Sequence, residues 1–151
     1  MGCLWASQNV RDLDLGSSRP LLLPAGRALI SGKAGDVLLL NTALGHLRTP
    51  LAHLSGCAAY GGSAYDPTQH AAFLPCESGL QRIGVGVGVT TVGSKRSVGD
   101  GGSPVIGGGL VWFQSHGTLE LRSERSGALH STRPSSTSVA DRFVAAPNRP
   151  M

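Results

Sequence analysis

Hydrophobic residues occur along the chain in short blocks, each bounded by Gly or Pro. Blocks of this kind are typical of β-strands, because a helix needs apolar residues at a spacing of about 3.6 over a longer stretch. One order recurs three times: an apolar strand, a turn rich in Gly or Pro, a second strand, a tight turn around Gly, and a third strand. The three copies span residues 20–40, 63–83 and 103–122.

The glycines of the tight turn are Gly35, Gly79 and Gly117, which lie 44 and 38 residues apart. This period is near the ~40–50 residues at which four-stranded propeller blades repeat. We therefore predict an all-β chain that forms a partial β-propeller, an open arc of about three four-stranded antiparallel blades. A closed ring needs roughly four to eight blades, so the pattern predicts a fragment of a longer propeller.

The blades are expected over residues 18–134. Residues 1–17 are expected to form a lead-in loop or edge strand, and residues 135–151 the start of a further blade with a frayed tail. Alternation of Gly and Val over 84–93 predicts an outer strand, and the polar, Gly-rich stretch 94–102 predicts an exposed loop. The best helical candidate, 42–54, is broken by Gly45 and Pro50.

The charge pattern changes the list of expected partners. The net charge of +4 is the balance of 13 Lys and Arg against 9 Asp and Glu, and the basic side chains are spread along the chain without a dense run. We therefore expect no nucleic-acid partner. No stretch approaches the ~18 consecutive apolar residues of a membrane span, so no transmembrane segment is expected. The first residues also lack the apolar core of a signal peptide.

Two cysteines have positions that suggest a pair. Cys57 precedes the first strand of the second copy and Cys76 ends its second strand. Antiparallel neighbours can bring two Cα atoms within about 4.4–6.8 Å, which a disulfide requires. A bridge would imply an oxidising compartment. Two small buried apolar residues would fit the same positions, and the sequence leaves both readings open.

Trp112 and Phe113 are adjacent in the third copy. Successive side chains of a strand point to opposite faces, so one of them is expected in the core. The other would line an interface between blades or with a partner.

Patterns of catalytic chemistry are sparse. The five histidines show none of the spacings of zinc sites, and no Gly-x-Ser-x-Gly elbow occurs. The Gly-x-Gly-x-Gly stretch at 84–88 is followed by no helical pattern that could seat a pyrophosphate. Asp100 lies in a predicted Gly-rich loop, but its single carboxylate supplies too few of the six to eight oxygens that a Ca²⁺ site requires. We predict no catalytic residue and no metal site.

The amino-acid sequence of the copies resembles the repeat of a known family. Residues 102–113 read Gly-Ser-Pro-Val-Ile-Gly-Gly-Gly-Leu-Val-Trp-Phe, followed by Ser-His-Gly-Thr-Leu-Glu-Leu at 115–121 and Arg-Ser-Gly-Ala-Leu at 125–129. This order resembles the repeat of pyrroloquinoline-quinone (PQQ)-like β-propellers, the quinoprotein-type family. Segments 12–18, 32–41, 57–66 and 73–80 are similar to earlier stretches of exported bacterial members. The resemblance covers residues 8–146 and implies a propeller fold in the cell envelope.

The chain departs from the family where the quinoproteins carry their chemistry. Their blades tend to end in Ala-x-Asp-x-x-Thr-Gly-Lys-x-x-Trp, whereas residues 121–131 keep mainly Gly127 of that motif. The neighbouring cysteines that flank the quinone in some family members are also absent. No cofactor is therefore predicted for the chain itself.

Three hypotheses for function follow. The first is a non-catalytic propeller segment that acts as a binding or scaffold module of the bacterial cell envelope, outside the cytoplasm. Its partner would be a protein or the remaining blades of a full propeller. The second is a fragment of a PQQ-dependent dehydrogenase, which would bind PQQ and Ca²⁺. The third is a truncated open reading frame without independent function.

Overall fold

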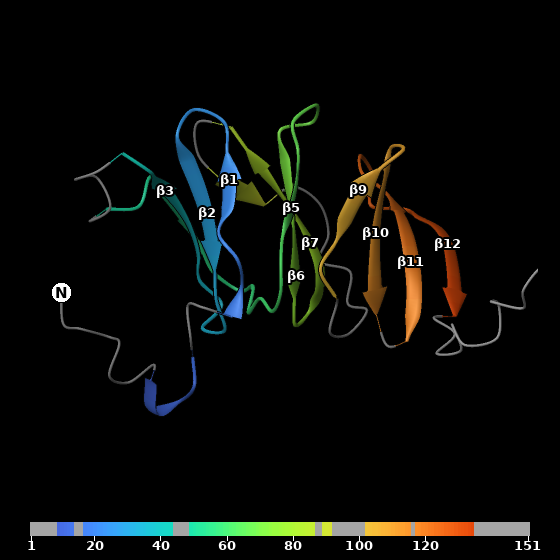
Figure 1. The fold of residues 1–151 in the computed structure, drawn as a ribbon, viewed down its shortest axis with the longest axis horizontal. Coiled ribbons are helices and arrows are strands. Elements are labelled where there is room, and N and C mark those ends of the chain that lie inside the picture. The colour runs from blue at the N-terminus through green and yellow to red at the C-terminus, as the bar shows by residue number, and fades with distance from the viewer. Residues whose placement is uncertain are drawn as a thin grey trace, which may run out of the picture.

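A computed structural model describes residues 9–13, 17–43, 49–86, 89–91, 102–115 and 117–134. Within these residues the chain forms twelve strands in three four-stranded antiparallel sheets. The sheets stand side by side in chain order, with the second between the first and the third (Figure 1). The expectation of an all-β arc of three four-stranded blades is confirmed.

Each blade uses four consecutive strands, and each strand pairs with the next one along the chain. The first blade comprises β1 (Leu21–Leu23), β2 (Arg27–Ser31), β3 (Val37–Asn41) and β4 (Ala52–Leu54). The second comprises β5 (Ala64–Asp66), β6 (Ala71–Cys76), β7 (Gly79–Val85) and β8 (Val89–Thr91). The third comprises β9 (Val105–Gly107), β10 (Leu110–Ser115), β11 (Thr118–Ser123) and β12 (Leu129–Pro134).

The three glycines that set the predicted period occupy equivalent places. Gly35, Gly79 and Gly117 lie between the second and third strands of their blades, with φ values of 87°, 108° and 70°. These values fall in the left-handed region, which glycine enters without a Cβ clash. A different turn of the second blade, between its first and second strands β5 and β6, is stabilised by Asp66, whose Oδ1 accepts the backbone N–H of Thr68 at 2.7 Å.

Two stretches differ from the predicted elements. The alternating segment 84–93 holds two strands, because β7 ends at Val85 and β8 returns antiparallel over Val89–Thr91 as the outer strand. Gly86, directly after β7, is exposed and has open space around it, which suits a change of direction. The helical candidate 42–54 ends in β4. The predicted further blade over 135–151 lies outside the described residues.

Apolar side chains fill the two spaces between blades. Between the first and second blades, leucines and a valine of β1–β3 pack with apolar residues of β6 and β7, in a cluster that includes Leu29, Leu39, Leu74 and Ile83. Between the second and third blades, Ala71 and Phe73 pack with Val111. The first strands of neighbouring blades also contact one another, β1 with β5 and β5 with β9. These contacts place the three first strands together at the hub of the arc.

Among the described residues, no helix has the length and apolar character needed to cross a membrane.

Candidate binding site at the hub of the arc

A pocket of about 410 Å³ lies where the three blades begin. Three segments that are far apart in sequence line it, and each lies just before the first strand of a blade. We call it the hub pocket, and its lining residues are Ser17, Ser18, Arg19, Gly61, Gly62, Ser63, Ser103 and Pro104. No sequence motif marked this site, because its parts lie roughly forty residues apart and only the closure of the arc brings them together.

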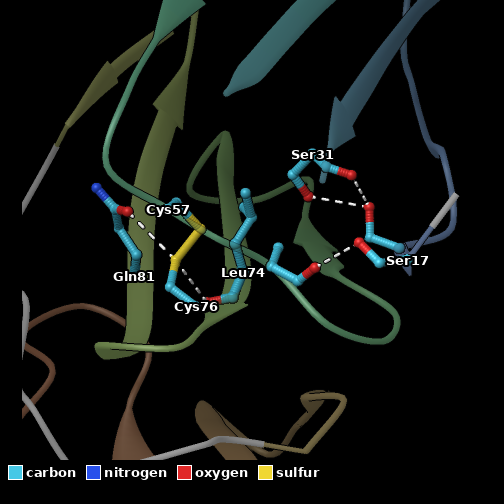
Figure 2. The surroundings of a disulfide bond; sticks show 8 residues. Ser17, Ser31, Cys57, Leu74, Cys76 and Gln81 are labelled. Atoms are coloured by element: carbon cyan, nitrogen blue, oxygen red, sulfur yellow. Dashed lines mark hydrogen bonds between the residues drawn. A yellow bond between two sulfur atoms is a disulfide. The ribbon is translucent and has the colours of Figure 1, made fainter. Parts of the chain in front are cut away.

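Backbone hydrogen bonds join the first two segments of the hub pocket. Ser18 and Gly61 form a parallel β-bridge, and the Gly61 N–H donates to the Ser17 carbonyl at 3.0 Å. The Ser17 hydroxyl donates to the Ala59 carbonyl at 2.9 Å, as Figure 2 shows. The entrance to the second blade is therefore fixed against the entrance to the first.

A side chain of the third blade completes the pocket. The Gly62 N–H donates to Ser103 Oγ at 2.8 Å. The neighbouring Gly61 has a φ of 92°, and a Cβ there would lie 2.8 Å from the same oxygen. The backbone conformation therefore favours glycine at position 61, and a Cβ there would also displace the Ser103 hydroxyl from Gly62.

Ser18 is buried at the base of this region. Its Oγ donates to the Ser31 carbonyl and lies 3.1 Å from Ser31 Oγ. Both serines are more than nine-tenths buried. Their mutual bonds satisfy polar groups that would otherwise be costly to remove from water.

The chemistry of the hub pocket is that of hydroxyls, backbone groups and one cation. Arg19 is exposed and contributes the only formal charge among the lining residues. A guanidinium beside hydroxyl donors suits a carboxylate or another anionic group. The lining has no carboxylate, so its donor set does not fit Ca²⁺, which prefers six to eight oxygens that include carboxylates. The described part of the chain likewise contains no group of three or more His, Cys, Asp or Glu side chains placed to hold a metal.

Cys57 and Cys76 form a disulfide with a Cα–Cα distance of 4.9 Å (Figure 2). The disulfide reading of the two cysteines is thus confirmed. Cys57 lies in the connection from β4 to β5, and Cys76 ends β6. Both residues are almost fully buried in the cluster between the first two blades.

The same connection is bonded to both blades that it joins. The Cys57 N–H donates to the Gly35 carbonyl at 3.0 Å, in the β2–β3 turn of the first blade. The Tyr60 N–H donates to the Pro75 carbonyl at 3.2 Å in β6. The disulfide therefore reinforces a segment that already links the two sheets and leads directly into the hub pocket.

The structure places the two adjacent aromatics on opposite faces of β10. Phe113 is buried, and the Arg122 guanidinium carbon lies 6.0 Å from its ring centroid. Trp112 is 37% exposed, and its indole N–H donates to the Gly107 carbonyl at 3.2 Å. Neither residue lines the hub pocket.

A polar cluster between the second and third blades escaped the sequence analysis. Arg82 donates from Nε to the Glu124 carbonyl at 3.1 Å and from Nη2 to Gln69 Oε1 at 3.3 Å. Gln69 in turn donates from Nε2 to Glu124 Oε2 at 3.3 Å. Asp66 and Glu124 are both more than nine-tenths buried. Their separation of 58 positions in the chain gave no signal that they would meet.

Burial raises the pKa of Glu124, and the nearby Asp66 carboxylate and its hydrogen bond with Glu124 raise that pKa further. Gln69 acts in the opposite direction by donating to the charged form. In the described residues Asp66 Oδ2 is a buried oxygen that has no hydrogen-bond donor. A protonated Glu124 would supply that donor.

Comparison with known proteins agrees with the fold. No protein-family model and no curated protein matches the sequence. Among solved structures, the crystal structure of BamB from Moraxella catarrhalis is similar, with a TM-score of 0.54 and 12% sequence identity. The match covers 78% of this chain and 37% of the BamB chain. The chain thus has a β-propeller fold and spans well under half the length of this structural neighbour.

Proposed function

We propose that the chain is a non-catalytic β-propeller segment that serves as a binding or scaffold module of the bacterial cell envelope, with PQQ-like repeats and further blades in its full-length form. The observation that carries the proposal is the hub pocket, where three blades converge on a polar, accessible surface. Loops and strand ends held by a rigid scaffold are common positions for binding residues.

The disulfide supports the location. Disulfides persist in oxidising compartments such as the periplasm and are rare in the cytosol. Cys57 and Cys76 form such a bond in the buried connection between two blades. The similarity to BamB supports a propeller architecture for the whole protein.

The pocket chemistry suggests the kind of partner. Arg19 is an exposed cation that lines the same pocket as the hydroxyls of Ser63 and Ser103. These groups suit an acidic segment of a partner protein, in which a carboxylate would pair with the guanidinium and the peptide backbone would bond to the hydroxyls. We propose an acidic peptide segment as the ligand of the hub pocket.

The test is binding of fluorescent acidic peptides, with basic peptides of the same length for comparison. We expect saturable binding of acidic peptides that weakens at least about tenfold in Arg19→Glu, because the change reverses the charge of the pocket. Arg133→Glu is the matched control, since Arg133 is an exposed arginine of β12 outside the pocket. Equal binding by Arg19→Glu and Arg133→Glu, or binding to neither class of peptide, would contradict the proposal.

A further inference from the structure

The disulfide between Cys57 and Cys76 is close to the hub pocket along the chain. Residues 55–63 connect β4 to β5, and we call them the connecting segment. The segment contains Cys57, and its last three residues line the pocket. It therefore forms one wall of the hub pocket, and the disulfide joins that wall covalently to β6 of the second blade.

Hydrogen bonds hold the same wall, and each of them is weaker than the covalent bond. The Tyr60 N–H donates to the Pro75 carbonyl at 3.2 Å, and the Gly61 N–H donates to the Ser17 carbonyl at 3.0 Å. A typical hydrogen bond stabilises a protein by only about 1 kcal/mol net, because water can replace it. When these bonds break in the oxidised chain, the disulfide still keeps Cys57 against β6. Without the disulfide, the connecting segment can open as one unit.

The surroundings of Cys76 also fit the reduced state. Its Sγ lies 3.3 Å from Gln81 Oε1 and 3.7 Å from the Leu74 carbonyl oxygen (Figure 2). A disulfide sulfur has no hydrogen to donate, whereas a thiol has one. After reduction the Cys76 thiol can donate to either oxygen, so a buried acceptor is already in place. The packing between the first two blades therefore accommodates the thiol as well as the disulfide.

We propose that the Cys57–Cys76 disulfide keeps the wall of the hub pocket closed, and that its reduction lets the connecting segment open while the blades stay folded. A dithiol such as dithiothreitol breaks the S–S bond by giving up two electrons and two protons. The products are two protein thiols and the cyclic disulfide of the reagent. Opening of this kind is local unfolding, which involves one segment and not the whole chain.

The consequence for binding rests on the proposed function. A ligand that needs the closed wall binds with an apparent affinity that falls in proportion to the closed fraction. Reduction should therefore weaken the binding of acidic peptides at the hub pocket, although the disulfide itself does not line that pocket.

The experiment measures amide hydrogen exchange of the full chain by NMR, with and without dithiothreitol, at several low urea concentrations. Exchange by local opening exposes little surface, so its rate is insensitive to urea, whereas exchange by global unfolding is accelerated by urea. Thiol quantification confirms the reduction, and Cys57→Ala with Cys76→Ala repeats the test without a reductant. Val111→Ala is the matched control, because Val111 is fully buried between the second and third blades and lies outside the connecting segment.

We expect the Gly61 and Gly62 amides of the reduced chain and of the double variant to exchange at least about tenfold faster than in the oxidised chain, at a rate insensitive to urea. The strand amides of β10 and β11 should stay protected. Val111→Ala should lower the global stability without changing the urea-insensitive rates at Gly61 and Gly62.

Unchanged exchange at Gly61 and Gly62 after reduction would overturn the inference. Acceleration that appears only as urea-dependent global unfolding would also overturn it, as would loss of protection in every strand, because the blades would then not stay folded. Acidic peptides that bind the oxidised and reduced chains equally well would contradict the coupling and leave the proposed function intact. Peptides that bind neither form would contradict the proposed function, and the exchange rates would still decide whether the disulfide closes the wall.

Discussion

Glu124 shows how one residue can make the contact between blades sensitive to pH. Its carboxyl is buried near Asp66, and both Gln69 and Arg82 donate hydrogen bonds to Glu124. The raised pKa of Glu124 means that the folded chain holds a proton which the unfolded chain releases near pH 4.5. Where the folded state binds more protons, the free energy of unfolding falls as the pH rises. The contribution of Glu124 is thus fully present below about pH 4.5 and is lost as the pH rises through the raised pKa.

Glu124→Gln should remove this dependence. The amide cannot ionise, and its oxygen can still accept the bond from Gln69. We expect the variant to melt at a higher temperature than the wild type at neutral pH, with a difference that shrinks toward pH 4.5. Glu77→Gln is the control, because Glu77 is exposed in the β6–β7 turn. A difference between Glu124→Gln and wild type that is constant with pH would contradict the raised pKa of Glu124.

Residue-level chemistry was only partly readable from the sequence. The two cysteines stood near predicted neighbouring strands, so the sequence offered their pairing as one of two interpretations that it left open. Asp66 and Glu124 gave no signal, because their contact depends on how the second and third blades face each other. Arg19 and Ser103 were hidden for the same reason, since the hub pocket exists only once three strand entrances meet.

At the scale of elements, the connection from β4 to β5 holds the first two blades together. It donates backbone hydrogen bonds to both blades, accepts one from Glu77 of the second blade, and is joined to β6 by the Cys57–Cys76 disulfide. The bridged residues are 19 positions apart. A loop of this size restricts the unfolded chain and stabilises the folded one by about 3 kcal/mol.

Cys57→Ala with Cys76→Ala should therefore lower the free energy of unfolding by about 3 kcal/mol. Chemical denaturation under non-reducing conditions measures the loss. A reducing agent should bring the wild type close to the double variant and should leave the variant unchanged, which serves as the internal control. If oxidised wild type and double variant unfold at the same denaturant concentration, the bond does not hold the blades as described.

Elements were foreseeable where the local pattern was strong and less so where glycine was frequent. The blocks Leu21–Leu23 and Val37–Asn41 are apolar and bounded by turn residues, and both are strands. The stretch 84–93 misled because alternation of Gly and Val suits one long strand as well as two arms of a hairpin. A glycine can either extend a strand or end it, and only the pairing of β7 with β8 decides between them.

The described residues form three blades stacked in chain order (Figure 1). The repeat period predicted the blades. The sequence does not show which face of each sheet packs against the neighbouring sheet. Leu29 and Trp112 illustrate this: both belong to the second strand of a blade, yet one is buried by the next sheet and the other is 37% exposed.

The most direct test is the set of nuclear Overhauser contacts between methyl and aromatic protons of the labelled chain. We predict contacts between the Phe73 ring and the Val111 methyls across the second space between blades, and among the methyls of Leu29, Leu39, Leu74 and Ile83 across the first. Absence of both sets in a folded sample, with the same side chains in contact with other segments, would contradict the stacked-blade arrangement.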